Sequence, residues 1–414
     1  MNQNFLPAIQ VQPKMKKIKQ WIFSGNFLYN HTLALVLWFG LPVYDIIYSL
    51  CRHPKINNFI IYKSAFYHLA EQKNLYAFYP SEYSDVNLYG PIFSIVIAPF
   101  ALLPIYTGYV LWCLFNVWIL YFAIRKLPIQ KNWQTAILIL SCNEMMNNTA
   151  WCQINPFIAA LIILGFSYAN KGKNGWALFF ILLATFIKLY GVVGFAFFIF
   201  NNKKLSFIKW SVIWSVLFFS LPVILSNPYY VTHSYADWFN AITSKASKNI
   251  RMDIHNDYQD ISVMGMIKRV FNWPSFKTWW VLLCAAILFV FQFIHVAYFK
   301  DLRFKLYILC SVCIALVIFS TSSESPTYII AFPFVCLWFL MQNPSKINNV
   351  IFIFALMLTC FSYSDIFTPY VRNNIIRPYS LKALPCFFIW IIITFQIYQK
   401  QFLLLNLKRQ PLTK

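Results

Sequence analysis

Apolar runs of nearly membrane-spanning length recur along almost the whole chain. A helix needs about 20 mainly apolar residues to cross the roughly 30 Å hydrocarbon core of a bilayer. Some runs are shorter and prolines interrupt others, so re-entrant pieces buried in protein are also an option. We predict an all-α, polytopic membrane bundle of about 10–12 transmembrane helices. The runs lie at residues 27–50, 91–104 with 105–124, 133–148 with 154–169, 175–200, 210–226, 278–299, 306–320, 327–341, 349–363 and 385–404.

The composition agrees with a membrane protein. Hydrophobic residues make up 60% of the 414 residues and charged residues 11%, whereas soluble domains average about 45–50% and 25%. This excludes a soluble enzyme and a disordered chain. The formal charge is +22, from 34 Lys and Arg against 12 Asp and Glu. In a membrane protein this excess indicates basic cytoplasmic loops and contact with anionic lipids rather than nucleic acid.

The charge distribution predicts the orientation of the chain. A basic segment, residues 1–26, and a basic tail, residues 405–414, flank one transmembrane domain at residues 27–404, and we place both in the cytoplasm. Three long polar stretches, 51–90, 227–277 and 362–384, then face outward. About twelve crossings satisfy this arrangement, but they leave two basic loops outside, against the positive-inside rule. Those loops carry Arg125, Lys126 and Lys131, and Lys171 and Lys173.

The first outer loop contains an amphipathic pattern. Phe59, Tyr62, Phe66 and Leu69 recur at i, i+3, i+7 and i+10, which places them on one face of a helix. We predict a helix that lies in the membrane interface with its apolar face down. The alternative is a loop helix packed on the bundle.

Several short motifs begin in this helix and continue along the chain in an ordered series. Their order and spacing resemble glycosyltransferase family 87, a family of polytopic enzymes in the GT-C superfamily, over about residues 20–395. The motifs are Asn58–Phe59–x–x–Tyr62 through Asn74–Leu75–Tyr76, Tyr89–Gly90–Pro91–Ile92–Phe93 through Leu103–Pro104, Cys152–Gln153–Ile154–Asn155–Pro156, Phe186–Ile187–Lys188–Leu189–Tyr190 and Ile261–Ser262–x–x–Gly265.

The resemblance implies a hexosyltransferase-type enzyme of a bacterial-type plasma membrane. It would move a mannose-like hexose or a pentose from a polyprenyl-phosphate donor to a lipid-linked or envelope glycan on the outer face, with inversion. One alternative is a transporter or flippase of lipid-linked glycans, although no internal repeat of the transporter kind is visible. Another is an inactive relative that acts in envelope-glycan assembly.

One residue of the family pattern is missing. The pattern has an Asp, the expected catalytic base, where this chain has Asn58, and an amide cannot accept a proton at neutral pH. Either the base has moved, the alignment slips or activity is lost. Our first candidate for a relocated base is Asp85, four residues before Tyr89. The second candidate is Asp45 in the first helix, and the third is Glu82. A solvated loop acid and an ion pair within the bundle are the ordinary explanations of Asp85 and Asp45.

The predicted substrate-binding residues centre on Lys188, in the middle of an apolar run. A charged residue there needs a partner or a water-filled cavity. The resemblance implies a role for it near the donor phosphate; the structural alternative is a lysine that snorkels or pairs with Glu144. The amide side chains of Gln153 and Asn155 would bind sugar or join helices by hydrogen bonds. The arginines, Arg372 and Arg377, would clamp phosphate or bind anionic lipid. The other predicted binding residues are Tyr62, His68, Gln153, Asn155, Tyr190, Glu324, Arg372 and Arg377.

We predict no resident cofactor. The six histidines lack metal-binding spacing, and no dinucleotide, P-loop or serine-hydrolase motif occurs. A divalent cation is possible, but the monophosphate donor implied by the resemblance does not require one.

Overall fold

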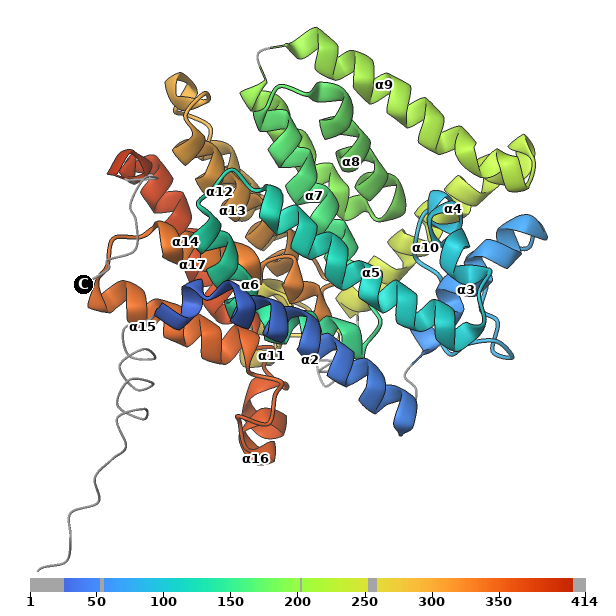
Figure 1. The fold of residues 1–414 in the computed structure, drawn as a ribbon, viewed down its shortest axis with the longest axis horizontal. Helices are drawn as coiled ribbons and strands as arrows, with labels where there is room; N and C mark the ends of the chain where they lie inside the picture. The colour runs from blue at the N-terminus through green and yellow to red at the C-terminus, as the bar shows by residue number, and fades with distance from the viewer. Residues whose placement is uncertain (1–25, 53–55, 202, 252–258, 405–414) are drawn as a thin grey trace, which may run out of the picture.

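The computed structural model describes residues 26–52, 56–201, 203–251 and 259–404. Within these residues every regular element is a helix and none is a strand (Figure 1). The predicted basic tail, and the predicted basic N-terminal segment apart from Asn26, lie outside the described residues. The all-α prediction is therefore confirmed for the described part of the chain.

The helices follow the predicted apolar runs closely. The polar stretches contribute four more: α3 (Asn57–Ala70), α10 (Pro228–Arg251), α11 (Val263–Val270) and the short α16 (Pro369–Val371). The apolar runs form α2 (His31–Cys51), α4 (Ile92–Ala101), α5 (Ile105–Lys126), α6 (Lys131–Ala150), α7 (Asn155–Asn170), α8 (Asn174–Ile187), α9 (Lys204–Ser220), α12 (Trp279–Phe291), α13 (Leu302–Ile318), α14 (Phe332–Met341), α15 (Lys346–Ala355) and α17 (Ala383–Tyr398). Short 3-10 or π-helical segments extend or join them: η1 (Asn26–Tyr29), η2 (Leu189–Phe200), η3 (Leu221–Leu225), η4 (Val296–Tyr298), η5 (Ser325–Ile329), η6 (Leu356–Cys360), η7 (Arg372–Ile376) and η8 (Gln401–Leu404).

Three helical segments are long and apolar enough to cross a bilayer: His31–Cys51, Ile105–Lys126 and Lys204–Leu225. The other apolar helices are 10–17 residues long. Helix α9 exposes apolar side chains along its length, including Leu205 at 83% and Val216 at 64%. Exposed apolar surface of this extent is costly in water and ordinary in lipid, which agrees with a membrane protein.

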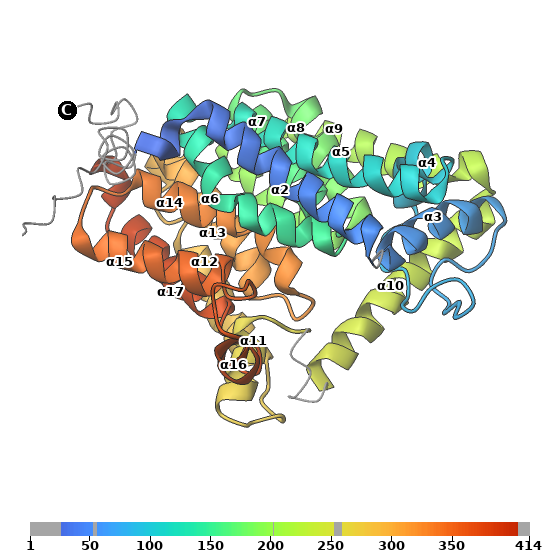
Figure 2. The same ribbon diagram turned by 60° about the horizontal axis from the view of Figure 1, so that its bottom comes forward.

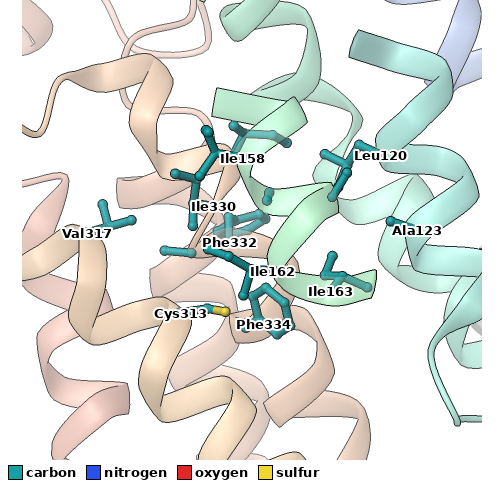
Figure 3. Packing of buried hydrophobic residues seen from close by; sticks show 14 of the residues in the cluster. Leu120, Ala123, Ile158, Ile162, Ile163, Cys313, Val317, Ile330, Phe332 and Phe334 are labelled. Atoms are coloured by element: carbon teal, nitrogen blue, oxygen red, sulfur yellow. The ribbon is translucent and has the colours of Figure 1, made fainter. Parts of the chain in front are cut away.

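Helix α7 lies at the centre of the bundle. Every residue from Asn155 to Ser167 is buried, which is typical of a helix that is apolar all round and enclosed by others. Figure 3 shows Ile162 and Ile163 of α7 between Leu120 of α5 and the α13 and α14 residues. This rigid core supports the first residue of α7, Asn155, which belongs to one of the motifs.

The single span predicted at residues 175–200 is instead a helical hairpin. Its two ends meet, because the Asn201 side chain donates a hydrogen bond to Asn174 Oδ1 and Asn174 Nδ2 donates to the Lys203 carbonyl over 3.3 Å. The turn comes at Lys188, whose backbone is extended (φ −146°, ψ 127°) and separates α8 from η2. Hydropathy alone cannot distinguish such a hairpin from one long helix.

The predicted polar loops gather on one side of the helical body. Figure 2 shows α10, α11 and α16 projecting from the same side. Short basic loops meet elsewhere: Lys305 donates to Asn170 Oδ1 over 3.0 Å, and Arg303 donates to the Leu403 carbonyl over 2.8 Å. The chain thus separates its long polar stretches from its short basic loops.

Helix α3 confirms the predicted amphipathic pattern. Phe59, Tyr62, Phe66 and Leu69 are all buried, so this face packs on the body of the protein. The observed contacts match the alternative of a loop helix packed on the bundle, and this packing brings Asn58 and Tyr62 to the site described next.

Candidate active site

A cavity of about 360 Å³ lies between α3, α10, the hairpin turn at Lys188 and the loop after α13. This volume is within the usual range for small-molecule sites, about 300–1,000 Å³. The lining residues come from segments that are far apart in the sequence. The predicted site residues among them are Asn58, Tyr62, Asp85, Gln153, Lys188, Tyr190 and Glu324.

Gly90 explains how two of the sequence motifs meet. Its N–H donates to the Ile187 carbonyl over 3.0 Å, which joins the Tyr89–Gly90–Pro91 motif to the residue before Lys188. A Cβ atom at position 90 would lie 1.9 Å from the Phe186 carbonyl oxygen. Only glycine permits this close approach of two backbones, so the motif docks the polar stretch at residues 51–90 on the hairpin.

Lys188 projects from the hairpin turn toward the start of α7. Its Nζ donates to Asn155 Oδ1 over 3.0 Å and lies 4.2 Å from the centre of the Tyr190 ring. The predicted structural alternative, pairing with Glu144, is wrong, because Glu144 binds Lys382 over 2.7 Å. Within the described part of the chain, Lys188 is held by a neutral amide and a cation–π contact, and no carboxylate pairs directly with it.

Glu324 lies opposite this cation on a tightly held loop. Its Oε2 accepts from Gln153 Nε2 over 3.1 Å, and its Oε1 accepts from Gln259 Nε2 over 3.0 Å. Burial raises the pKa of Glu324 above its usual value; the charges of Lys188 and Lys245 oppose this shift and that of Asp85 adds to it. The side chain is therefore a half-buried, oriented carboxyl group on the wall of the cavity.

The Ser262–x–x–Gly265 motif fixes Gln259 and the loop of Glu324. Ile261 N–H donates to the Ser323 carbonyl over 2.8 Å, and Ser262 Oγ accepts the Gly265 N–H over 3.1 Å at the start of α11. Arg269 donates to the Gln259 carbonyl over 2.7 Å. The motif thus acts on the cavity through the residues it positions.

The polar stretch at residues 51–90 forms the facing wall. Asn58 Nδ2 donates to the Trp151 carbonyl over 2.7 Å, and the Tyr62 and Tyr89 hydroxyls lie 3.3 Å apart. Asp85 is exposed, and its Oδ1 accepts the N–H of the next residue, Val86, over 2.8 Å. Among the residues that the structure describes, Asp85 and Glu324 are the carboxylates of the cavity lining.

Helix α10 adds residues that the sequence reasoning missed. Trp238 donates from Nε1 to the Leu88 carbonyl over 3.0 Å, and the half-buried Lys245 gives the cavity a second lysine. The signal was present, because apolar residues recur at i, i+4, i+7 and i+11 of a helix. Those residues are Val231, Tyr235, Trp238 and Ile242.

Other predicted residues do not line the cavity. Asn155 lies behind Lys188, and Asp45 is half-buried within α2. His68 is buried against Glu82, with Nε2 3.0 Å from Oε2, and this pair holds the outer loop on α3.

The two predicted arginines belong to a separate projection. Arg372 pairs with Asp365 over 2.6 Å, and the Arg377 guanidinium lies 5.1 Å from the centre of the Tyr363 ring. Both lie in the α16–η7 segment or directly after it, and this segment projects from the body beside α11 (Figure 2).

An apolar groove of about 990 Å³ adjoins the polar cavity. Tyr190, Ala246 and Ser322 line both, so the two spaces meet between the hairpin and α10. The groove is otherwise bounded mainly by apolar side chains of η2, α12 and α13, with Trp390 of α17. A polar chamber thus opens beside a long apolar surface.

A family model for glycosyltransferase family 87 matches residues 87–321, which is more than half of the chain. The chain belongs to glycosyltransferase family 87. No curated protein matches it. The matched region includes Gly90, Gln153 and Lys188; it begins just after Asp85 and ends just before Glu324.

Membership of family 87 gives the class of activity. The family implies a membrane glycosyltransferase, with a sugar donor and an acceptor as substrates. Glycosyl transfer needs cations or hydrogen-bond donors at the leaving group, and it needs a base at the acceptor hydroxyl. The cavity brings together lysines, carboxylates, amides and aromatic rings that can meet these needs.

Proposed function

We propose that this family 87 protein transfers a hexose, mannose-like, or a pentose from a polyprenyl-phosphate donor to a lipid-linked or envelope glycan. One observation carries the proposal: a polar cavity with lysines and carboxylates opens directly into an apolar groove. A donor of this class has the same two parts, because a charged sugar phosphate is attached to a long hydrocarbon tail. The partners would be these two substrates and membrane lipids.

The donor phosphate would lie at the junction of cavity and groove. Lys188 and Lys245 flank this junction, since Tyr190 and Ala246, their near neighbours in sequence, line both spaces. Lysine ammonium groups suit phosphate as point charges, and they would stabilise the negative charge that develops on the leaving phosphate. The tail would follow the apolar groove, and the sugar would contact Tyr190 and Trp238.

Ten crossings and one re-entrant hairpin account for the charge distribution. Because the α8–η2 hairpin returns the chain to the side from which it enters, Lys171 and Lys173 lie on the same side as Lys203. Helices α6 and α7 then cross the membrane once each, so Arg125 and Lys126 before them lie on the same side as Lys171 and Lys173 after them. This side would be the cytoplasm by the positive-inside rule, with both termini there and the cavity facing outward, in a bacterial-type plasma membrane.

An inverting reaction takes place in a single displacement and needs one base for the acceptor hydroxyl. Two carboxylates of the cavity compete for this role: Asp85, the first candidate from the sequence, and Glu324. No metal is required, because Lys188 and Lys245 can offset the charge of a monophosphate. We therefore expect transfer to persist in the presence of EDTA.

The proposal is tested with membranes that carry the protein and a panel of radiolabelled polyprenyl-phosphate sugars. Wild type should convert one donor of the panel into a labelled glycan, and Lys188→Gln should lower this conversion while the protein still accumulates. Absence of product with every donor, together with transbilayer movement of labelled lipid-linked glycan in proteoliposomes, would make the protein a transporter instead.

A further inference from the structure

The family pattern leaves this chain without a carboxylate at Asn58, although Asn58 still lines the cavity. An amide side chain donates and accepts hydrogen bonds but takes up no proton at neutral pH. If the chain transfers sugar, another group at the same cavity must accept the proton of the acceptor hydroxyl.

We propose that Glu324 is the catalytic base that replaces the carboxylate absent at Asn58. This inference rests on the proposed function. In the reaction, the acceptor oxygen would bond to the anomeric carbon as its proton passes to Glu324. The bond between that carbon and the phosphate oxygen would break, and its electron pair would leave with polyprenyl phosphate. Water would then take the proton from Glu324.

Glu324 is oriented in a way that a base requires. Gln153 and Gln259 each donate to one of its carboxylate oxygens over 3.1 and 3.0 Å. A carboxylate has about four lone-pair sites, so the two amides and the capping box with Thr327 still leave room for an acceptor hydroxyl. Its backbone is fixed as well, because the Glu324 N–H donates to Thr327 Oγ1 over 3.1 Å. A pre-oriented base lowers the entropic cost of reaching the transition state.

One short turn contacts both the proposed base and the cation of the cavity. Gln153 holds Glu324, while Asn155, two residues later, holds Lys188. The Cα atoms of these two residues are at most about 7 Å apart, so neighbouring residues of one turn anchor the carboxylate and the cation. The Cys152–Gln153–Ile154–Asn155–Pro156 motif would thus hold the carboxylate and the phosphate-binding cation on two sides of one sugar.

Asp85 is less suited to this role. It is exposed, and one of its oxygens already accepts the Val86 N–H. Glu324 is half-buried, and its partial burial raises the pKa of the carboxyl group, which makes the carboxylate a stronger base than a solvated one. An acceptor hydroxyl must compete with bulk water at Asp85 but much less at Glu324.

The test compares the full chain and four variants in native membranes with the donor that wild type uses. Glu324→Gln should lower the rate at saturating donor about 10²- to 10⁴-fold, with little change in the half-saturating donor concentration. Asp85→Asn should cost less than Glu324→Gln. Glu71→Gln, an exposed residue of the first outer loop that pairs with Lys73, is the matched control and should behave as wild type.

A second variant separates chemistry from folding. Glu324→Gln combined with Gln153→Glu keeps an amide–carboxylate pair and the charge of the cavity, but moves the carboxylate. It should accumulate as wild type and remain as inactive as Glu324→Gln. A rate near wild type in either Glu324 variant, or a greater loss in Asp85→Asn, overturns the role of Glu324. A wild type that uses no donor overturns the proposed function itself.

Discussion

The Nζ atom of Lys188 lies 3.0 Å from Oδ1 of Asn155, which joins the turn of a helical hairpin to the first residue of the central helix α7. Two sequence motifs therefore form one unit, although Asn155 and Lys188 are 33 residues apart in the chain. The buried helix gives this unit a rigid base, and the hairpin brings a cation to the cavity. The arrangement explains why a lysine stands in the middle of an apolar run.

A second cation, Lys245, should share the donor phosphate with Lys188. We expect Lys245→Gln to lower kcat/KM for the donor about ten- to a hundredfold, since hydrogen bonds to charged groups contribute about 1.5–3 kcal/mol. Lys248→Gln, an exposed lysine one turn later on α10, should have little effect. Equal losses in both variants would indicate general attraction to anionic lipid, and transfer assays at several donor concentrations distinguish the two cases.

Gly90 should be essential for docking the first outer loop. A methyl group at this position would collide with the Phe186 carbonyl, so we expect Gly90→Ala to destabilise the protein by about 1–3 kcal/mol, as overpacking does. Transfer should fall as well, because Lys188 follows the displaced segment. Gly40→Ala, where an added Cβ meets nothing within 4 Å, is the matched control. Equal melting temperatures of the two variants in detergent would contradict this account.

The sequence predicted the apolar helices well because their pattern depends on local composition. It could not show that residues 175–200 form a hairpin, because the contact between Asn174 and Asn201 is made in three dimensions. It also treated residues 227–277 as a polar loop, although α10 is an amphipathic helix that closes the cavity.

The candidate site was predicted only in part, because motifs indicate residue types but do not show which segments pack together. Motif residues such as Gln153, Lys188 and Tyr190 line the cavity, as the resemblance suggested. Lys245 and Gln259 carry no motif, and only the packing of outer segments brings them to the site. Conversely, His68 carries a chemically versatile side chain, but its burial against Glu82 is visible only in the structure.

A buried ion pair should stabilise the loop that carries Glu324. Lys382 and Glu144 are 1% and 0% exposed at their side chains, and Lys382 also donates to Ser325 Oγ over 3.1 Å. We expect Lys382→Met to cost about 3–5 kcal/mol, because it leaves a buried charge unpaired. The double variant Lys382→Met/Glu144→Met should recover much of this loss. Thermal unfolding in detergent measures both, and an equal or larger loss in the double variant would refute the role of the pair.

The pH dependence of transfer should reflect the environment of Glu324. Burial raises the pKa of this carboxyl, so protonation should suppress transfer at a pH above the usual glutamate value of about 4.3. The stability of the folded state responds in the opposite direction. A carboxyl group whose pKa is raised by folding stabilises the folded state at low pH, where the group is neutral. This stabilisation is lost as the pH rises through the raised pKa.

Rates and melting temperatures measured over the same pH range separate the two effects. The account expects the acid limb of the rate to appear without parallel unfolding, and to move in Glu324→Asp. An acid limb that matches the loss of folded protein would argue against titration of a catalytic group.

The most direct test of the central claim compares wild type with Asn58→Asp in the transfer assay. If Glu324 is the base, wild type already transfers sugar from a polyprenyl-phosphate donor, and Asn58→Asp does not increase the rate. If wild type forms no product and Asn58→Asp forms it, the native chain is an inactive relative that has lost its base, and the account given for Glu324 is contradicted.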